Sequence, residues 1–273
     1  MMDSLNVPLT LEGSFALHQM ARIRWPEWKR LDPAVRADIA SEAASLVENM
    51  GPANSAVFSL LGHKGDLMFL HFRRSMDQLN QAELDLARLR LWDYLELTTS
   101  YVSVVELGLY DSTARMWRTF QEQGLKPASE EWKKAQEEEI ERQRKAMEPR
   151  LYPAIPAHRF ACFYPMDRKR GEEKNWYQVP FHDRNRMMHE HGQVGRRYAE
   201  VVRQIITGSI GFDDWEWGVD LFSEDPLWFK KLIYEMRFDE VSAVYALFGT
   251  FYVGVRTLPA QLAALLEGQA PER

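Results

Sequence analysis

The histidines are the first residues of this chain to consider for metal or acid–base chemistry. Seven are present, and only His189 and His191 lie close together in the sequence. Residues two positions apart on a helix point about 200° away from each other, so these imidazoles do not form a chelating pair. His191 shares the spacing of the apolar residues around it, whereas His189 falls on the polar side. The pattern therefore predicts one inward-facing imidazole of the two, either a ligand of a bound group or a core histidine bonded to a carbonyl.

Two glycines interrupt the same predicted helix directly after His191. Gly192 and Gly195 each cost about 1 kcal/mol relative to alanine inside a helix. Such residues are tolerated where another group must approach the backbone closely. A flat macrocycle above an axial imidazole would be a group of this kind.

A second set of chemically capable side chains lies at the end of an apolar, strand-like run. Tyr164 closes this run, and the charged segment 167–170 follows it after two residues. A phenol beside several cations could relay an electron next to a substrate that carries carboxylates. The alternative is a tyrosine at the rim of a strand, followed by a solvated loop.

Composition limits the kind of protein that positions these residues. The chain has 273 residues, 45% of them apolar, which suits one large domain or two fused small ones. With a net charge of −6 and no long basic block, we expect no nucleic-acid or membrane partner. No leader-like start and no membrane-length apolar run are present, which predicts a cytoplasmic protein. The single cysteine, Cys162, is predicted to be a small buried hydrophobe.

The order of predicted elements is β-α-β-β-α-β, and it occurs twice. The periodicity predicts strands at 14–23, 56–61, 66–72 and 101–107, and again at 159–165, 204–209, 215–222 and 248–255. Helices are predicted from Asp32-Pro33, over 75–95, over 181–202 and from Asp225-Pro226. We therefore predict an α+β fold in which two ferredoxin-like repeats form a dimeric α+β barrel-type subunit, with the helices outside.

Four segments follow from this pattern. Residues 1–110 are the N-terminal repeat, 150–258 the C-terminal repeat that carries Tyr164 and His191, and 259–273 a C-terminal tail. Between the repeats, 111–149 contains a potential helix cap at Ser129 and oppositely charged residues four apart. We interpret this segment as a solvated helical insertion or linker.

Several short segments together resemble one known family. They are YVSVVEL at 101–107, RLYP at 150–153, YPM at 164–166, HG at 191–192, QIITGS at 204–209, GFDD at 211–214, EWG at 216–218 and YEMRFDEVS at 234–242. With them the chain resembles the coproheme decarboxylases of the chlorite dismutase-like superfamily over residues 11–254. The set is far more specific than any single motif.

The resemblance implies roles for individual residues. It makes His191 the axial ligand of the haem iron, Tyr164 the tyrosine that is oxidised to a radical, and Gln204 the distal polar group. The family typically has lysine where Arg168 stands. Arginine keeps the positive charge but replaces the compact ammonium group with a planar guanidinium. The residues implied to contact the substrate are Tyr110, Arg150, Tyr164, Pro165, Met166, Asp167, Arg168, Arg196, Gln204 and Ser242.

The implied activity is peroxide-dependent decarboxylation of two propionates of iron coproporphyrin III (coproheme) to vinyl groups, which gives haem b. Coproheme is then both substrate and redox centre, and hydrogen peroxide is the co-substrate. The resemblance also implies a homopentamer and transient contact with a coproporphyrin ferrochelatase.

Two alternatives stay open. The first is a chlorite dismutase or peroxidase-like haem enzyme, although chlorite dismutases have arginine where Gln204 stands. The second is a non-catalytic haem carrier or sensor with the same fold.

Overall fold

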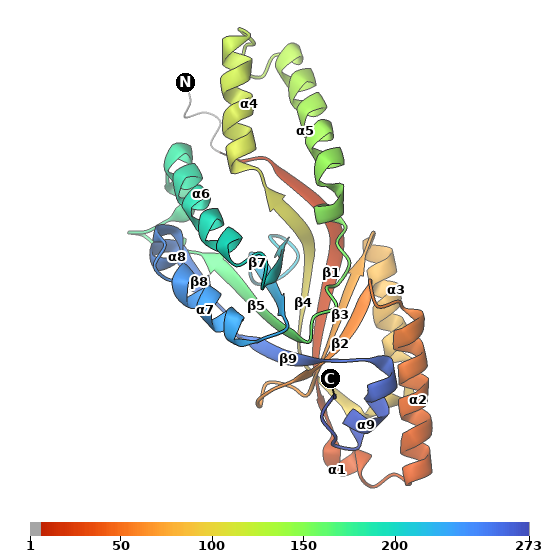
Figure 1. Cartoon of the computed structure of the whole chain (residues 1–273). Coiled ribbons are helices and arrows are strands. Elements are labelled where there is room, and N and C mark those ends of the chain that lie inside the picture. The colour runs from red at the N-terminus through yellow and green to blue at the C-terminus, as the bar shows by residue number, and fades with distance from the viewer. Residues whose placement is uncertain (1–6, 273) are drawn as a thin grey trace.

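The strands of the chain form one antiparallel sheet that closes on itself. A computed structural model describes residues 7–272 (Figure 1). The strand order is β7-β6-β4-β1-β3-β2-β9-β5, the pairing of β5 with β7 closes the ring, and β8 adds to β5. The strands are β1 (Thr10–Ile23), β2 (Ser55–Leu60), β3 (Leu67–Arg73), β4 (Leu95–Gly108), β5 (Phe160–Arg168), β6 (Arg203–Gly208), β7 (Trp217–Ser223), β8 (Ala246–Phe248) and β9 (Tyr252–Thr257).

The ring consists of two ferredoxin-like sheets joined at both edges. Each half supplies strands in the spatial order 4-1-3-2, namely β4-β1-β3-β2 and β9-β5-β7-β6. Val57 opposite Thr257 joins β2 to β9, and Val104 opposite Gly208 joins β4 to β6. The predicted α+β fold of two ferredoxin-like repeats is therefore confirmed.

Helices cover the outside of this barrel (Figure 1). In the first half, α2 and α3 lie against the sheet, and in the second half α6, α7 and α8 do so, while α4 and α5 project from one end. None of the described helices is both long and apolar enough to cross a membrane. The helices are α1 (Trp25–Trp28), α2 (Pro33–Asn49), α3 (Met76–Ala87), α4 (Tyr110–Glu122), α5 (Glu130–Leu151), α6 (Phe181–Arg197), α7 (Leu227–Met236), α8 (Glu240–Tyr245) and α9 (Leu262–Leu266), with 3₁₀ turns η2 (Arg90–Tyr94), η3 (Trp176–Gln178) and η4 (Pro259–Gln261).

Alternation along the strands separates the barrel interior from the helix layers. On β5, Phe163 packs into the interior, whereas Cys162 and Tyr164 pack beneath the helices of the second half. Cys162 is buried, as predicted, and burial raises the pKa of its thiol to about 12. The outer face of β5 therefore carries the residues that the sequence marks for chemistry.

The end of one predicted helix is wrong for a tertiary reason. The helix predicted over 75–95 ends at Ala87, because Leu89 adopts extended backbone angles and Leu91 then enters the core. At the predicted segment boundary, α5 continues to Leu151, which is fully buried and packs with Leu11. Local periodicity does not reveal such packing.

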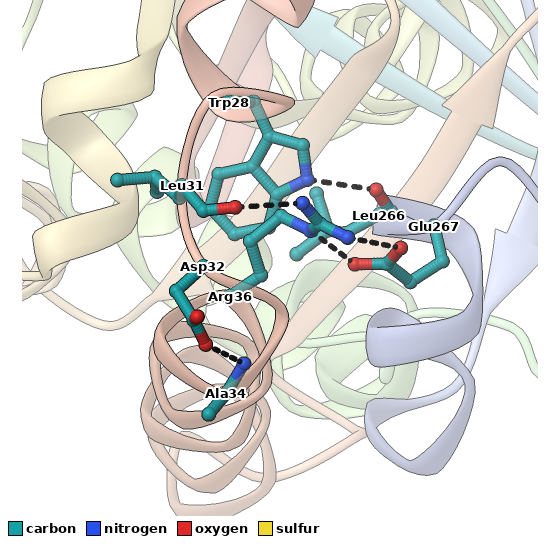
Figure 2. Close-up of polar contacts among 7 residues, drawn as sticks. All are labelled: Trp28, Leu31, Asp32, Ala34, Arg36, Leu266 and Glu267. Atoms are coloured by element: carbon teal, nitrogen blue, oxygen red, sulfur yellow. Dashed lines mark hydrogen bonds and ion pairs between the residues drawn. The ribbon is translucent and has the colours of Figure 1, made fainter.

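The C-terminal segment returns to the first half of the chain, where α9 packs against α2 (Figure 2). Trp28 Nε1 donates a hydrogen bond of 2.8 Å to the carbonyl of Leu266, and the indole is almost completely buried. Arg36 donates to both carboxylate oxygens of Glu267, at 2.7 and 3.0 Å, and to the carbonyl of Leu31. Residues 259–267 of the predicted tail therefore pack against α2.

Replacing Trp28 with alanine is expected to destabilise the protein by about 3 to 5 kcal/mol, because a buried indole and its hydrogen bond are lost. Arg36→Ala should have a much smaller effect, since its partner Glu267 is exposed to water. Urea unfolding of the two variants measures the difference. Equal midpoints would show that the contact between Trp28 and α9 contributes little to the stability of the protein.

Candidate functional site

His191 lies on α6 with one ring nitrogen already engaged. Its Nδ1 is 2.8 Å from Oδ2 of Asp239, and its side chain is 25% exposed. Nε2 is therefore the nitrogen left to bind a metal, and a carboxylate behind a histidine is the usual support of a metal ligand. A core histidine bonded to a backbone carbonyl, the alternative considered for this position, is not what the structure shows.

Asp239 owes its position to the start of α8, which it caps. Its Oδ1 accepts a hydrogen bond of 2.8 Å from the backbone N–H of Ser242, whose hydroxyl is 3.4 Å from His191 Nδ1. Burial opposes ionisation of Asp239, but the hydrogen bond and charge of His191, together with the hydrogen bonds of Ser242, lower the pKa of the carboxyl. No role was predicted for Asp239, although it lies within the motif 234–242.

His189 faces away from His191, as predicted. It is exposed, and its Nδ1 contacts Oδ2 of Asp111 at 3.1 Å. Within residues 7–272, no three histidine, cysteine or acidic side chains are grouped to hold a bare metal ion.

Tyr164 is buried on the outer face of β5 and is held by aromatic neighbours. Its ring stacks on Phe251 at 4.4 Å between centroids and lies 5.8 Å from Phe248. Burial raises the pKa of the phenol above its usual value, and the charges of Arg168 and Arg237 oppose this only partly. Tyr164 is therefore a protonated phenol near neutral pH rather than a tyrosine at a solvated rim.

Arg168 follows on the same face of β5 and is buried with a donor unused. Its guanidinium lies 5.3 Å from the ring of Trp176, and Nη2 is 3.8 Å from Sδ of Met188. Nη1 has no hydrogen-bond partner among the described residues, and burial lowers the pKa of the group. Because a buried charged donor is costly without an acceptor, this nitrogen is suited to bind an anion.

Tyr110, the first residue of α4, lies in the same cluster as Trp176, the ring beside Arg168. Its ring stacks on Phe181 at 5.9 Å between centroids, and burial raises the pKa of its phenol while Arg184 and Arg168 lower it. Arg184 is buried 6.0 Å from the ring of Trp176. Trp176 and Arg184 were missed, since nothing in their sequence context marks them as neighbours of β5.

Gly195 brings α6 against β6 at Gln204. A Cβ atom at Gly195 would lie 3.4 Å from Nε2 of Gln204 and 3.3 Å from Cε of Met236. A Cβ atom at Gly192 would meet only Arg196, at 3.9 Å. Of the two helical glycines, Gly195 is therefore the one at which a side chain would crowd Gln204 and Met236.

Gly195→Ala is expected to weaken haem uptake about tenfold, because its methyl group would crowd the Gln204 amide and Cε of Met236. Gly192→Ala, which has room, is the matched control and should leave uptake unchanged. Both changes favour the helix by about 1 kcal/mol, so lost uptake would not reflect lost folding. Absorbance titration with haem and urea unfolding measure the two effects, and equal affinities would contradict the assignment.

The remaining predicted residues are not grouped with His191. The side chain of Pro165 faces Gly249, and Asp167 Oδ1 accepts a hydrogen bond of 2.7 Å from the backbone N–H of Glu216. Arg150 is exposed in the last turn of α5, where it contacts Met147, and Arg196 is exposed on α6. The layer between α6, α8 and the sheet thus brings together Tyr110, Tyr164, Met166, Arg168, His191, Gln204 and Ser242.

Comparison with known proteins identifies relatives of this chain. A family model described as chlorite dismutase matches residues 36–257. A haem-binding protein from Thermus thermophilus is 38% identical, with a TM-score of 0.80 over 96% of this chain and 98% of that chain. Two chlorite dismutase variants from Candidatus Nitrospira defluvii are 18% and 19% identical, with TM-scores of 0.69 and 0.70. They cover 93% and 95% of this chain, and 95% and 98% of their own, and support the fold alone.

Proposed function

Since the chain belongs to the chlorite dismutase family, we propose that it is a peroxide-dependent coproheme decarboxylase. Its substrate would be iron coproporphyrin III, and its product haem b, formed by converting two propionates to vinyl groups. The observation that carries the proposal is the buried Nη1 of Arg168, which has no hydrogen-bond partner within residues 7–272 and lies on the same strand and face as the buried phenol of Tyr164. A porphyrin with several acid arms supplies the acceptor that this nitrogen lacks.

The donor set fits an iron porphyrin. His191 would bind the iron through Nε2, held in orientation by Asp239. Gln204 supplies an uncharged amide from β6, on the sheet side of this layer. His191 reaches the same layer from the helix side, on α6. When bound, the iron porphyrin supplies the two-electron chemistry with peroxide.

Tyr164 performs the step at the acid arm. Its phenol gives up an electron and a proton, and the resulting tyrosyl radical takes a hydrogen atom from the β-carbon of a propionate. Loss of carbon dioxide and one electron then leaves a vinyl group. Each ionised propionate therefore consumes one peroxide and one proton, and yields carbon dioxide and two waters.

Cations and hydroxyls in this layer would hold the arms. The guanidinium of Arg237 lies 3.7 Å from the ring of Phe248, beside Tyr164, and was missed from the sequence. Charge-assisted hydrogen bonds contribute about 1.5 to 3 kcal/mol each, so a few suffice to position an arm. Contacts from Ser242, Arg150 and Arg196, a cytoplasmic location, a homopentamer and contact with a ferrochelatase are further parts of this proposal.

A non-catalytic haem carrier is the second candidate, because the 38% identical relative is named as a haem-binding protein. Peroxide titration of the ferric coproheme complex, followed by mass spectrometry of the porphyrin, separates the two. If the protein is a decarboxylase, the porphyrin loses the mass of two propionate conversions, and at least two peroxides are consumed. An unchanged porphyrin supports the carrier, and oxygen evolved from chlorite would instead favour a chlorite dismutase.

A further inference from the structure

Lys64 connects the first repeat to the ring on which Tyr164 stacks. It lies in the turn 61–66 between β2 and β3, and its side chain is half-buried. Its Nζ donates a hydrogen bond of 2.6 Å to the backbone carbonyl of Phe251, in the second repeat. The ring of Phe251 stacks on Tyr164 at 4.4 Å between centroids, with the two planes 25° apart. The ammonium group of Lys64 is therefore linked to the phenol through one residue.

The turn that carries Lys64 is itself anchored at its base. The backbone N–H of Leu60 donates a hydrogen bond of 2.8 Å to the carbonyl of Asp66, which closes the turn. The N–H of Leu61 donates one of 2.9 Å to the carbonyl of Val253, on β9. Because of these two bonds, the ammonium of Lys64 extends from a fixed part of the barrel.

The segment that Lys64 binds is the short connection between β8 and β9. At its start, the N–H of Gly249 donates a hydrogen bond of 2.8 Å to the carbonyl of Pro165, on β5. A Cβ atom at Gly249 would lie 2.8 Å from Cγ of Pro165, so the connection approaches β5 closely there. Gly249 thus attaches the start of the segment to β5, and Lys64 attaches its end, at Phe251, to the first repeat.

The two aromatic neighbours of Tyr164 are held in different ways. Phe248 lies on β8, where it pairs with Met166 of β5, and its ring is 5.8 Å from that of Tyr164. Phe251 lies between β8 and β9 and stacks more closely on the phenol. The position of Phe251 therefore depends on the contacts of the connection, and the bond from Lys64 is one of them.

Hydrogen transfer from an acid arm is sensitive to the position of the phenol. Reacting groups have to be held within about 0.5 Å and 10–20° of the productive geometry, and a displacement of about 1 Å can lower a rate about 100-fold. Stacking fixes the ring of Tyr164 only as well as Phe251 is fixed. A hydrogen bond from a charged donor is roughly twice as strong as one between neutral groups. Lys64 is thus suited to limit the motion of Phe251.

We propose that Lys64 is a positioning residue for Tyr164, which it orients through the carbonyl and the ring of Phe251. The inference rests on the proposed function, in which Tyr164 takes a hydrogen atom from the acid arm. In this scheme Lys64 contacts neither the arm nor the iron. The first repeat thereby takes part in a reaction whose other named residues lie between Tyr110 and Ser242.

Fluorine NMR of the ligand-free protein labelled with 3-fluorotyrosine reports on the ring directly. The chain has ten tyrosines, and Tyr164→Phe identifies the Tyr164 signal by its loss. Lys64→Met keeps a long side chain but removes the donor, so we expect this signal to shift and broaden. Arg22→Met is the matched control, because Arg22 donates to the carbonyl of His63 in the same turn, at 3.0 Å, and its loss should leave the signal unchanged. An unchanged Tyr164 signal in Lys64→Met would overturn the proposal.

The same variant should separate binding of the substrate from its conversion. Lys64→Met is expected to bind ferric coproheme within about twofold of the wild type, because no contact with the porphyrin is lost. Its conversion rate with saturating coproheme should fall about 10- to 100-fold. Absorbance titration and porphyrin mass spectrometry measure the two quantities. A loss of affinity with an unchanged conversion rate would contradict a positioning role.

Chemical rescue separates positioning from folding. Lys64→Cys, alkylated with bromoethylamine, regains an ammonium on a side chain of similar length, while the buried Cys162 is protected from the reagent. Both the fluorine signal and the conversion rate should return towards those of the wild type. A folded, alkylated protein in which neither returns would overturn the proposal. If the wild type leaves coproheme unchanged, the proposed function fails, whereas the fluorine measurement still decides whether Lys64 positions Tyr164.

Discussion

Tyr164→Phe is expected to bind coproheme normally and to lose decarboxylation by about a thousandfold or more, equivalent to ~4 kcal/mol in the barrier. The phenol is buried between Phe251 and Phe248, and phenylalanine fills the same space. What disappears is the hydroxyl that can lose an electron and a proton and then take a hydrogen atom from the arm. Porphyrin mass spectrometry after a peroxide titration gives the result.

The matched control for Tyr164 is Tyr252→Phe. Tyr252 lies on β9, the neighbour of β5 in the barrel, and its ring packs on the interior side against Phe163. This control should decarboxylate normally. Normal turnover by Tyr164→Phe would show that another group performs the hydrogen transfer.

His191→Ala is expected to lose axial ligation and to bind ferric coproheme about a hundredfold more weakly, ~2.8 kcal/mol. The imidazole presents Nε2 because Asp239 holds Nδ1. The ferric absorption and electron paramagnetic resonance spectra should change, and added imidazole should restore them in part. An unchanged spectrum would mean that the iron is held elsewhere.

Two further variants test whether the effect is specific to His191 and its support by Asp239. Asp239→Asn should keep the ligand but weaken binding about 10- to 100-fold, because the orientation and basicity of the imidazole depend on the carboxylate behind it. His189→Ala, which removes an exposed imidazole two positions away, should leave the spectrum unchanged. If Asp239→Asn behaved like the wild type, the role of Asp239 would be confined to capping α8.

Much of the fold was predictable because it depends on local periodicity. The order β-α-β-β-α-β, repeated, followed from alternating strands and helical faces, and the confirmed ferredoxin-like halves agree with it. The inward direction of His191, in contrast to His189, and the buried Cys162 followed from the same signal. Helix ends were less predictable, since burial of Leu91 and Leu151 depends on distant partners.

The candidate site was predictable only in part. Resemblance and pattern named Tyr164, Arg168 and His191, and the structure brings all three to the layer beneath the helices of the second half. Pattern did not show that Pro165 and Asp167 turn their side chains to the opposite face from Tyr164. The reason is that one unbroken motif in a strand contributes alternate residues to different faces.

The sequence by itself determined which faces of each strand and helix are apolar, and which residues carry a phenol, an imidazole or a guanidinium. Only the tertiary structure decided that Asp239 stands behind His191, and that Tyr110 and Arg168 both lie at Trp176. Periodicity acts within an element. These contacts join residues from different strands and helices, which become neighbours only when the barrel closes.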